Sequence, residues 1–455
     1  MEQHIFILSD LHIAASGPLN NFHAGEELVS FVRALPQKAT LLFAGDLFDL
    51  LQREDRPAVF DLNGAPDLLS DLLAAVASYD WGAAFFSALG DFVQRGGTCV
   101  ILPGNHDPEL YHPDCLPLLR KTIGLSEDDP GLTLFVEPGP WIAEVGGWEI
   151  LVGHGHRPDP WNDVDPTRVL TALERAEPSL PLPPGSLLVV KTLNRFKAAV
   201  DPATGAPRFP FVDLLKPETP WVPLLLLYLA PRLTLESLPG AVGGTARPVL
   251  LRAIRRRLLG GPTLVNMASP GEEPEDFFAP LAEAFVEGLT PADAGAPDAV
   301  IRRLDLWLSE ASLGSPGQLA VHGGAGRLLL RAALRRLTSE STFFDPRTPS
   351  AYDRTFCRDH LSEGIRSRVV ITGHTHAARF LQAPDDRIYF NTGTWTDLIQ
   401  PPSSLDDEEL QTWIDNLEAG QAPRLRRLTF AEISAGGPRL ALWDKSGAIS
   451  LFEPT

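Results

Sequence analysis

The segment Ile5-Phe6-Ile7-Leu8-Ser9-Asp10-Leu11-His12 joins a short apolar run directly to a carboxylate and an imidazole. The apolar run predicts a buried β-strand. Asp10 and His12 follow at its end, and alternation along an extended backbone would turn both side chains to the same side. Ligands of α/β proteins bind beyond the carboxyl ends of strands, so the segment predicts a site at the edge of a sheet.

Four more polar clusters follow apolar runs in the same way. They are Gly45-Asp46-Leu47-Phe48-Asp49, Gly104-Asn105-His106-Asp107, Gly153-His154-Gly155-His156 and Gly373-His374-Thr375-His376. Six of the eleven histidines lie in these five clusters, a concentration that a solvated surface does not explain. Taken singly, each cluster is also compatible with an ordinary turn or a hydrogen-bonded loop. Together, and in this order, they indicate a metal centre.

The residue types of the clusters define the kind of ion. Carboxylates, imidazoles and an asparagine carbonyl suit borderline divalent ions such as Mn, Fe, Co, Ni and Zn. One bridging carboxylate can hold two such ions roughly 3.5–4 Å apart. The glycines let the backbone pass close to the metals without Cβ clashes. We expect two divalent ions, with manganese as the first choice and Fe, Zn, Co or Ni as alternatives.

Composition narrows the class of protein. The chain has 455 residues and a formal net charge of -19, which argues against general nucleic-acid binding through the phosphate backbone. Its three cysteines form no CxxC pair, so neither a disulfide framework nor a thiolate zinc site is expected. The N-terminus shows no signal-peptide pattern, and the longest uncharged apolar run, residues 219–231, is shorter than the roughly 20 residues of a membrane span. We expect a cytoplasmic protein.

The order of apolar runs predicts an α/β fold interrupted by an insertion. Strands are predicted at residues 5–8, 40–44, 98–102, 368–372, 379–382, 387–391, 424–433, 439–443 and 449–452, with a helix at 25–34 and a helical region at 68–94. Residues 132–136, 141–145 and 148–152 predict a meander, with Gly146-Gly147 as a hairpin turn. Between about residues 157 and 345, the chain is punctuated by proline and glycine, and its pattern predicts helices at 248–259 and 326–337. The predicted domains are therefore a core in two halves, 1–156 and 346–455, separated by a mostly helical insertion, 157–345.

The five clusters resemble the motifs of the calcineurin-like metallophosphoesterases, which are DxH, GDxxD, GNH[DE], a Gly-His motif and GHxH. The resemblance covers about residues 1–160 and 360–400. It implies an αββα double-sheet sandwich with the two-metal site at one edge. Carried over motif by motif, it implies that Asp10, His12, His376 and the bridging Asp46 hold one metal, and that Asp46, Asn105, His154 and His374 hold the other.

The same resemblance implies roles for the remaining cluster residues. His106 would stabilise charge or protonate the leaving oxygen. Asp49 and Asp107 would orient histidines by hydrogen bonds, with Asp107 the expected partner of His106. His156 would contact substrate or lie behind the ligands. The implied reaction is hydrolysis of a phosphate ester or pyrophosphate bond by in-line attack of a metal-bridging hydroxide.

The substrate is less closely defined. Ser9-Asp10-Leu11-His12, Gly45-Asp46-Leu47-Phe48-Asp49 and Gly373-His374-Thr375-His376 are most similar to the UDP-2,3-diacylglucosamine pyrophosphatase branch, whose members cleave a nucleotide-lipid anhydride at the membrane surface. That branch usually has arginine where this chain has His106, and its insertion is far shorter. We expect a small phosphorylated substrate, with a lipid- or nucleotide-linked one as the narrower expectation.

Arginines offer further candidate contacts. Arg53, Arg157 and Arg379 adjoin the clusters and could bind phosphate, or could be ordinary surface charges. Arg252, Arg255, Arg256 and Arg257 share a predicted amphipathic helix that could rest on an anionic membrane or lipid, or could belong to the core of the insertion.

Two other functions remain open at the sequence level. DNA-repair exonucleases of the superfamily also carry GDxFD and GNHD, so a metal-dependent nuclease is one alternative. A non-catalytic scaffold with the same fold is the other, although every predicted ligand is present.

Overall fold

The computed structural model describes residues 3–15, 17, 19–53, 56–159, 162–200, 203, 205, 250–255, 282, 286, 295–313, 345–349, 353–354, 368–383, 387–399, 407–444 and 447–452. The chain divides into two compact units. Met1–Ser186, Thr342–Leu398 and Arg424–Thr455 make up the first unit, and Leu187–Ser341 with Ile399–Pro423 the second. All five polar clusters belong to the first unit.

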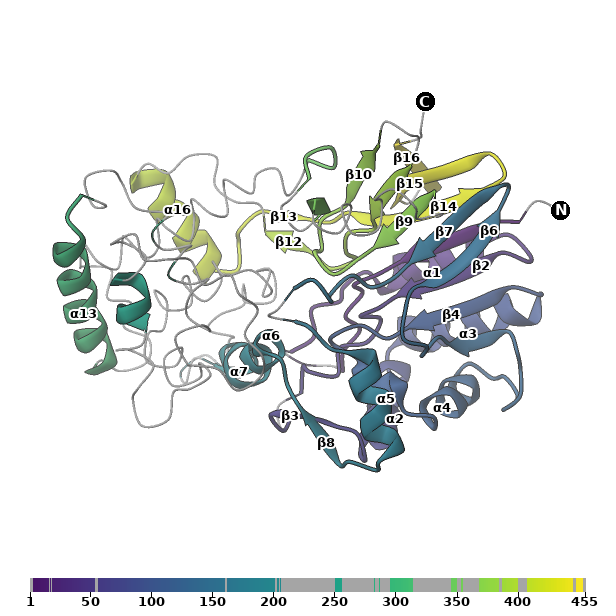
Figure 1. The fold of residues 1–455 in the computed structure, drawn as a ribbon, viewed down its shortest axis with the longest axis horizontal. Helices are drawn as coiled ribbons and strands as arrows, with labels where there is room; N and C mark the ends of the chain where they lie inside the picture. The colour runs from purple at the N-terminus through teal and green to yellow at the C-terminus, as the bar shows by residue number, and fades with distance from the viewer. Residues whose placement is uncertain are drawn as a thin grey trace. The chain divides into compact units, whose positions relative to one another are not determined.

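A seven-stranded sheet forms the centre of the first unit, in the order β16-β15-β14-β1-β2-β4-β5 (Figure 1). Its strands are β1 (Ile5–Leu8), β2 (Thr40–Ala44), β4 (Thr98–Leu102), β5 (Leu132–Leu134), β14 (Leu428–Ser434), β15 (Gly437–Asp444) and β16 (Gly447–Phe452). The four strands from β1 to β5 are parallel to one another, whereas β14 joins β1 in antiparallel register and starts an antiparallel extension. The parallel strands therefore end at one edge.

A second sheet of five strands has the order β10-β11-β9-β7-β6. Its strands are β6 (Trp141–Val145), β7 (Trp148–Val152), β9 (Val369–Thr372), β10 (Arg379–Gln382) and β11 (Ile388–Asn391). The three central strands β7, β9 and β11 are parallel, and the two edge strands are antiparallel to their neighbours. Two of the central strands, β7 and β9, run directly into polar clusters.

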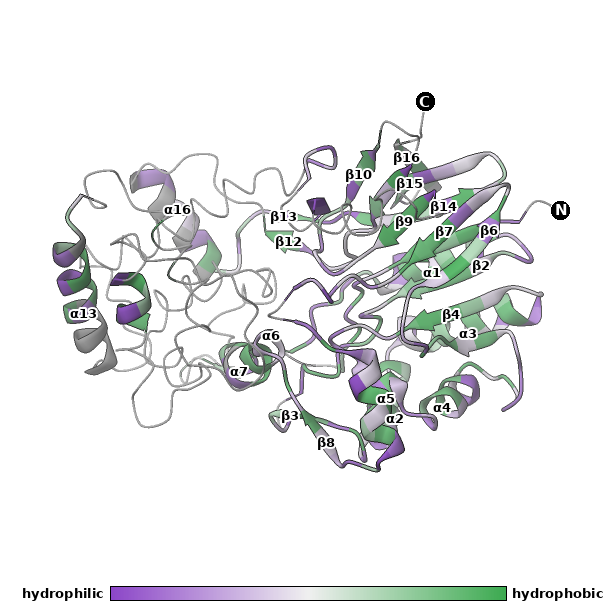
Figure 2. Cartoon of the chain, in the orientation of Figure 1, coloured by the Kyte–Doolittle hydropathy of each residue, from purple (hydrophilic) through white to green (hydrophobic). Residues whose placement is uncertain are grey.

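The two sheets bury a common core, and β1 shows how. Ile5 and Ile7 join a cluster that also contains Val152, Ile371 and other side chains of the second sheet. Phe6 and Leu8 point to the opposite face, where helices cover the first sheet. Because both faces of β1 are buried, all four of its residues must be apolar. Figure 2 shows the same hydrophobic character in β4 and β7.

Four helices contribute side chains to the core cluster that contains Phe6 and Leu8. They are α1 (Gly25–Ala34), α2 (Ala65–Ala77), α3 (Asp80–Gln94) and α4 (Cys115–Thr122). Among the described residues, no single helix is long and apolar enough to cross a membrane. Helices α2 and α3 meet the length and hydropathy requirement only as a pair, across a bend of 109°. Their buried leucine, valine and phenylalanine side chains belong to the core of the first unit.

The remaining elements are short or lie in the second unit. They are β3 (Val59–Asp61), η1 (Pro108–Tyr111), α5 (Pro166–Glu174), β8 (Ser179–Pro181), α6 (Pro184–Leu188), η2 (Val189–Leu193, a π-helix), α7 (Asn194–Ala198), α13 (Pro297–Leu313), β12 (Leu398–Ile399), α16 (Asp407–Glu418) and β13 (Arg424–Leu425). Strands β3 and β8 pair in antiparallel register.

The structure confirms the predicted α/β class with its two sheets and most of the predicted strands. Gly146 and Gly147 both have positive φ, as the predicted hairpin turn requires. The predicted meander is wrong, because β5 pairs with β4 in the first sheet while β6 and β7 belong to the second. The predicted helical region 68–94 consists of two helices, α2 and α3, and the predicted strand 424–433 is broken into β13 and β14.

The predicted insertion is described only in part. Residues 250–255 are helical, as predicted for 248–259, whereas the predicted helix at 326–337 lies outside the described residues. The domain boundaries at 156 and 345 stay a prediction.

Candidate metal centre

The five polar clusters converge at the carboxyl ends of β1, β2, β4, β7 and β9. Backbone hydrogen bonds tie the loops together: His12 N–H donates to Asp46 O at 2.9 Å, and Gly373 N–H donates to His154 O at 2.9 Å. The second bond joins segments more than 200 residues apart in the sequence. The sheet order therefore brings together the clusters that the sequence predicted to share one edge.

The backbone at the centre adopts conformations that side chains disfavour. Seven non-glycine residues of the described chain have positive φ, and five of them are predicted metal ligands: Asp10, His12, Asp46, His374 and His376. Such conformations cost of order 1–3 kcal/mol each and persist only where the surroundings enforce them. Their concentration here marks a functional site rather than a set of ordinary turns.

The ligands predicted for the first metal form a compact group. His376 Nε2 lies 3.3 Å from Asp10 Oδ1 and 3.0 Å from His12 Nε2. His12 Nε2 lies 3.8 Å from Asp46 Oδ2. Asp10, His12 and His376 place one ligand atom each within 4.8 Å of one another, and all are buried.

The ligands predicted for the second metal surround Asn105. Its Oδ1 lies 3.0 Å from His154 Nε2 and 3.1 Å from His374 Nδ1. His154 Nε2 also lies 3.2 Å from Asp46 Oδ2. This same Asp46 oxygen faces His12 of the first group, so Asp46 occupies the position of a bridge.

The hydrogen-bond partners of the histidines indicate that these atoms fit a cation. His154 Nδ1 lies 2.9 Å from the carbonyl of Ala44 and His12 Nδ1 lies 3.1 Å from Asp49 Oδ2, so in the neutral rings each Nδ1 carries the hydrogen. Their Nε2 lone pairs then face carboxylate and amide oxygens, which are also acceptors. Asn105 Nδ2 is buried and has no hydrogen-bond partner among the described residues. The contacts of the Asn105 amide are therefore made by its oxygen, the atom that would bind a metal. Converging acceptors call for positive charge between them.

The electrostatics agree with this assignment. Burial raises the pKa of Asp46, but the charges of His154 and His106 outweigh it and hold that pKa well below its usual range. Burial lowers the pKa of His154, yet Asp46 raises it to about 9. In both cases the buried carboxylates demand compensating positive charge, which divalent ions would supply.

The partner of His106 differs from the sequence-based expectation. His106 Nδ1 lies 3.1 Å from Asp49 Oδ2, the same oxygen that faces His12 Nδ1. Asp107 instead accepts backbone N–H bonds from Phe48 at 3.1 Å and Gly104 at 2.6 Å. The expected Asp107–His106 pairing is therefore wrong. Burial and the nearby charge of Asp46 raise the pKa of Asp107 to about 7, and its contacts hold two of the site loops together.

Other candidate residues lie behind or beside the centre. His156 is buried, and its Nε2 lies 2.9 Å from Val164 O. Arg379 is buried, with Nε 3.4 Å from Asp353 Oδ2, a placement that favours a structural ion pair over substrate contact. Arg53 and Arg157 are about half exposed and pair with Asp71 and Asp163, as ordinary surface charges do.

A polar loop after β11 supports the centre and was not predicted. Asn391 Nδ2 donates to Gly373 O at 2.6 Å and to Thr375 Oγ1 at 3.1 Å. These two bonds hold the loop of residues 373–376 in place. Thr394 Oγ1 donates to Asp10 O at 2.7 Å. Ser9 Oγ hydrogen-bonds Asp10 Oδ2 and lies 2.6 Å from Thr392 Oγ1. The signal was the run Asn391-Thr392-Gly393-Thr394 at the end of a predicted strand, a sixth polar cluster without histidine.

Gly373 gives a test of how closely the backbone must approach the ligands. A Cβ at this position would overlap Ser9 Oγ and Asp10 Oδ2, so Gly373→Ala should displace Asp10 and weaken metal binding by about 10-fold or more. Isothermal titration with Mn would measure the loss. Gly153→Ala is the matched control, since its Cβ would have no neighbour within 4 Å, and it should bind as the wild type does. Equal affinities in the two variants would contradict the placement of Asp10.

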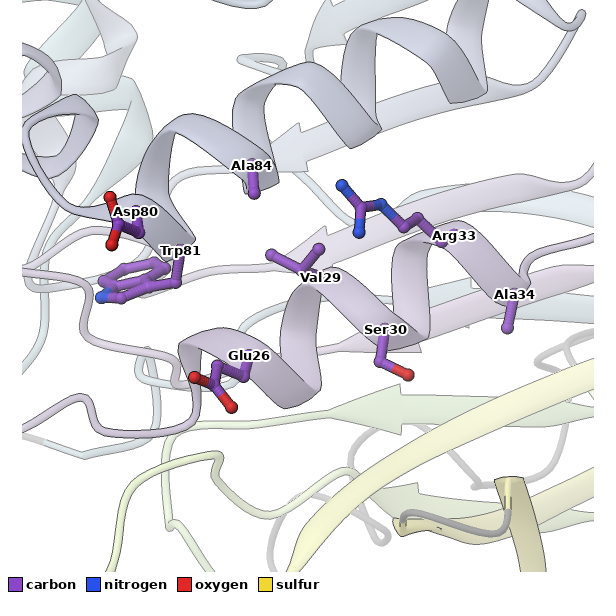
Figure 3. Close-up of a pocket in the computed structure, with 8 residues that line it drawn as sticks. All are labelled: Glu26, Val29, Ser30, Arg33, Ala34, Asp80, Trp81 and Ala84. Carbon is purple, nitrogen blue, oxygen red and sulfur yellow. The ribbon is translucent and has the colours of Figure 1, made fainter.

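A shallow groove between α1 and α3 is a separate feature (Figure 3). Its volume is about 630 Å³, and it is lined by Glu26, Val29, Ser30, Arg33, Ala34, Asp80, Trp81 and Ala84. None of these residues is a predicted ligand or catalytic group, so the groove is not part of the metal centre.

Comparison with known proteins identifies the first part of the chain. Residues 3–189 match the family described as calcineurin-like phosphoesterase. The match includes four of the five clusters and agrees, over these residues, with the resemblance that the motifs indicate. No curated protein matches the chain significantly.

Proposed function

We propose that this chain, which carries a calcineurin-like phosphoesterase domain, hydrolyses a phosphate ester or anhydride with the help of two divalent metal ions. The observation that carries the proposal is the convergence of acceptor atoms on both sides of Asp46 Oδ2. That oxygen lies 3.2 Å from His154 Nε2 and 3.8 Å from His12 Nε2, two nitrogens of separate ligand groups. A scaffold without catalysis has no need for such a cluster of buried carboxylate, imidazole and amide groups.

The chain's own residues would hold the ions and prepare the site. Asp10, His12 and His376 would hold one ion, Asn105, His154 and His374 the other, and Asp46 both. Divalent ions bound there supply Lewis-acid activation of water and neutralise charge on a phosphate. Asp49 orients His12 and His106 together, because its Oδ2 faces the Nδ1 of each ring. Its pKa, which burial raises and the charge of His106 lowers, falls far below the usual range overall, so it remains an acceptor.

His106 is the group that we assign to proton transfer. With Nδ1 directed to Asp49, Nε2 is the nitrogen that would donate a proton to the leaving oxygen or stabilise charge on it. The side chain is buried, at 3% exposure, which strengthens its electrostatic effect.

Metal content and hydrolysis measured together test the proposal. Purified protein is analysed by mass spectrometry for metals, loaded with Mn, and assayed with p-nitrophenyl phosphate and bis(p-nitrophenyl) phosphate. Two ions per chain with turnover of either probe would support it. A folded protein that binds no Mn and turns over neither probe would favour the scaffold alternative, and cleavage of linear DNA would favour the nuclease.

His106→Ala should separate proton transfer from metal binding. We expect the rate with bis(p-nitrophenyl) phosphate to fall by about 10²- to 10⁴-fold, because a positioned acid contributes that much. Metal content should remain at the wild-type level, since the His106 backbone N–H, which donates to Asp46 Oδ1 at 2.9 Å, is unchanged. His23→Ala, an exposed histidine, serves as control. Because a His106 ring nitrogen lies within 4.8 Å of ligand atoms of His12 and Asp46, loss of a metal would identify His106 as a ligand instead.

For the substrate we propose a small phosphorylated compound, and within that class a nucleotide-linked or lipid-linked pyrophosphate. The support is the likeness of three clusters to the UDP-2,3-diacylglucosamine pyrophosphatase branch. His106 and the long predicted insertion are two differences from that branch. We further propose Mn as the native metal, a cytoplasmic location, and lipid contact through the insertion. Assays with UDP-sugar, UDP-lipid and simple monoester substrates would rank the substrate classes by kcat/KM. The same assays with and without anionic vesicles would test lipid contact.

A further inference from the structure

The loop that follows β7 contributes a carboxylate to the metal centre as well as the ligand His154. Asp159 Oδ2 lies 3.0 Å from His374 Nε2, across 215 residues of sequence. His374 Nδ1, on the other side of the same ring, lies 3.1 Å from Asn105 Oδ1. Asp159 thus stands behind a predicted ligand, on the side away from the other ligands. It belongs to none of the five clusters.

Asp159 is itself held in place by its own loop. Asn162 Nδ2 donates to Asp159 Oδ2 at 2.9 Å, and Asn162 is 1% exposed. Two backbone bonds of 3.0 Å, Asp159 N–H to His156 O and Asn162 N–H to Asp159 O, fix the turn on which the carboxylate sits. The Asp159 side chain is 19% exposed, so it is partly shielded from water.

His156 closes the base of this loop. Its Nε2 lies 2.9 Å from the carbonyl oxygen of Val164, an acceptor, so Nε2 carries the hydrogen and donates it. The bond joins His156 to Val164, residues that precede and follow Asp159 in the sequence.

The hydrogen bond from His374 has a consequence for its other nitrogen. A carboxylate only accepts, so the His374 Nε2 facing Asp159 carries the hydrogen. In the neutral ring Nδ1 then keeps its lone pair and directs it toward Asn105 Oδ1, another acceptor. Metal-binding histidines in proteins commonly donate their second N–H to a carboxylate in this way, which fixes the tautomer and the direction of the ring.

We propose that Asp159 is a positioning residue that fixes the tautomer and orientation of His374 for the second metal, with Asn162 holding Asp159 in place. The inference rests on the proposed function, since it assumes that a metal binds at His374. It predicts unequal effects on the two ions, because the ring that Asp159 contacts, His374, is a ligand of the second group.

Titration of apoprotein with Mn, followed by electron paramagnetic resonance, tests the inference without relying on activity. In Asp159→Ala the first ion should bind as in the wild type, whereas the second should bind about 10- to 100-fold more weakly. At one to two equivalents of Mn the spectrum should show an isolated ion where the wild type shows a coupled pair. Asp163→Ala is the matched control, because Asp163 lies in the same loop but pairs with the half-exposed Arg157.

Asp159→Asn provides a second variant of the same size, which can accept the bond from His374 but lacks the charge. Its affinity for the second ion should lie between those of the wild type and Asp159→Ala, and excess Mn should restore turnover in both variants. Wild-type affinity for both ions in Asp159→Ala would overturn the positioning role alone. A wild-type protein that binds no second ion would instead overturn the two-metal function and this inference with it.

Discussion

Replacing Asp46 by asparagine should remove both metal ions and lower the hydrolysis rate by about 10³-fold or more. Asp46 Oδ1 accepts the backbone N–H of His106 at 2.9 Å, while Oδ2 faces His154 and His12. In Asp46→Asn the amide oxygen would keep the bond to His106, so the NH2 group would take the place of Oδ2. That group is a donor and cannot bind a cation. Loss of several kcal/mol of charge stabilisation corresponds to the expected rate effect.

The measurement pairs metal analysis with the rate on bis(p-nitrophenyl) phosphate at saturating Mn. Asp91→Asn makes the same chemical change at an exposed position on α3 and should leave both quantities unaltered. Full metal content and wild-type rate in Asp46→Asn would show that Asp46 does not bridge two ions. Loss of one ion only would show that it belongs to a single group.

Glu109→Leu should destabilise the first unit by about 3–5 kcal/mol, the usual cost of leaving a buried charge without its partner. Arg56 Nη2 forms an ion pair with Glu109 Oε1, and both side chains are fully buried. Arg56 Nε and Nη1 and Glu109 Oε2 have no hydrogen-bond partner among the described residues, so the pair is incompletely satisfied. Burial raises the pKa of Glu109, and the charge of Arg56 offsets this only in part.

The double variant Arg56→Met/Glu109→Leu distinguishes a loss of packing from an unpaired charge. Removing both charges should restore most of the lost stability, since an apolar pair of similar volume often replaces a buried ion pair without cost. Urea denaturation followed by tryptophan fluorescence would measure the free energies of unfolding. A double variant as unstable as Glu109→Leu would show that shape rather than charge dominates at this position.

The candidate metal ligands could be predicted from the sequence because the signal for each is local. An apolar run ends, and a glycine with a carboxylate, imidazole or amide follows within a few residues, as at Leu41–Asp46 and Val369–His374. The buried strands could also be predicted from the sequence, because burial of both faces requires continuous apolar runs such as Ile5–Leu8. Parallel strands then carry their loops to one edge of the sheet.

The hydrogen-bond partners of the ligands could not be found in this way. His106 adjoins Asp107 in the sequence, yet its ring faces Asp49, 57 residues earlier. The pairing of His374 with Asp159 spans 215 residues. The sequence neighbours of a histidine say little about what lies behind its ring, because that depends on which loops the sheet order places side by side.

The sequence by itself therefore determined the α/β class, most of the strands and the candidate metal-binding residues, since these depend on local burial and on chemistry within short motifs. Only the tertiary structure decided the sheet to which Leu132–Leu134 belongs, the carboxylate that faces His106 and the polar loop that supports Asp10. Hydrogen bonds act over about 3 Å, and which distant groups come that close is set by the packing of the whole unit.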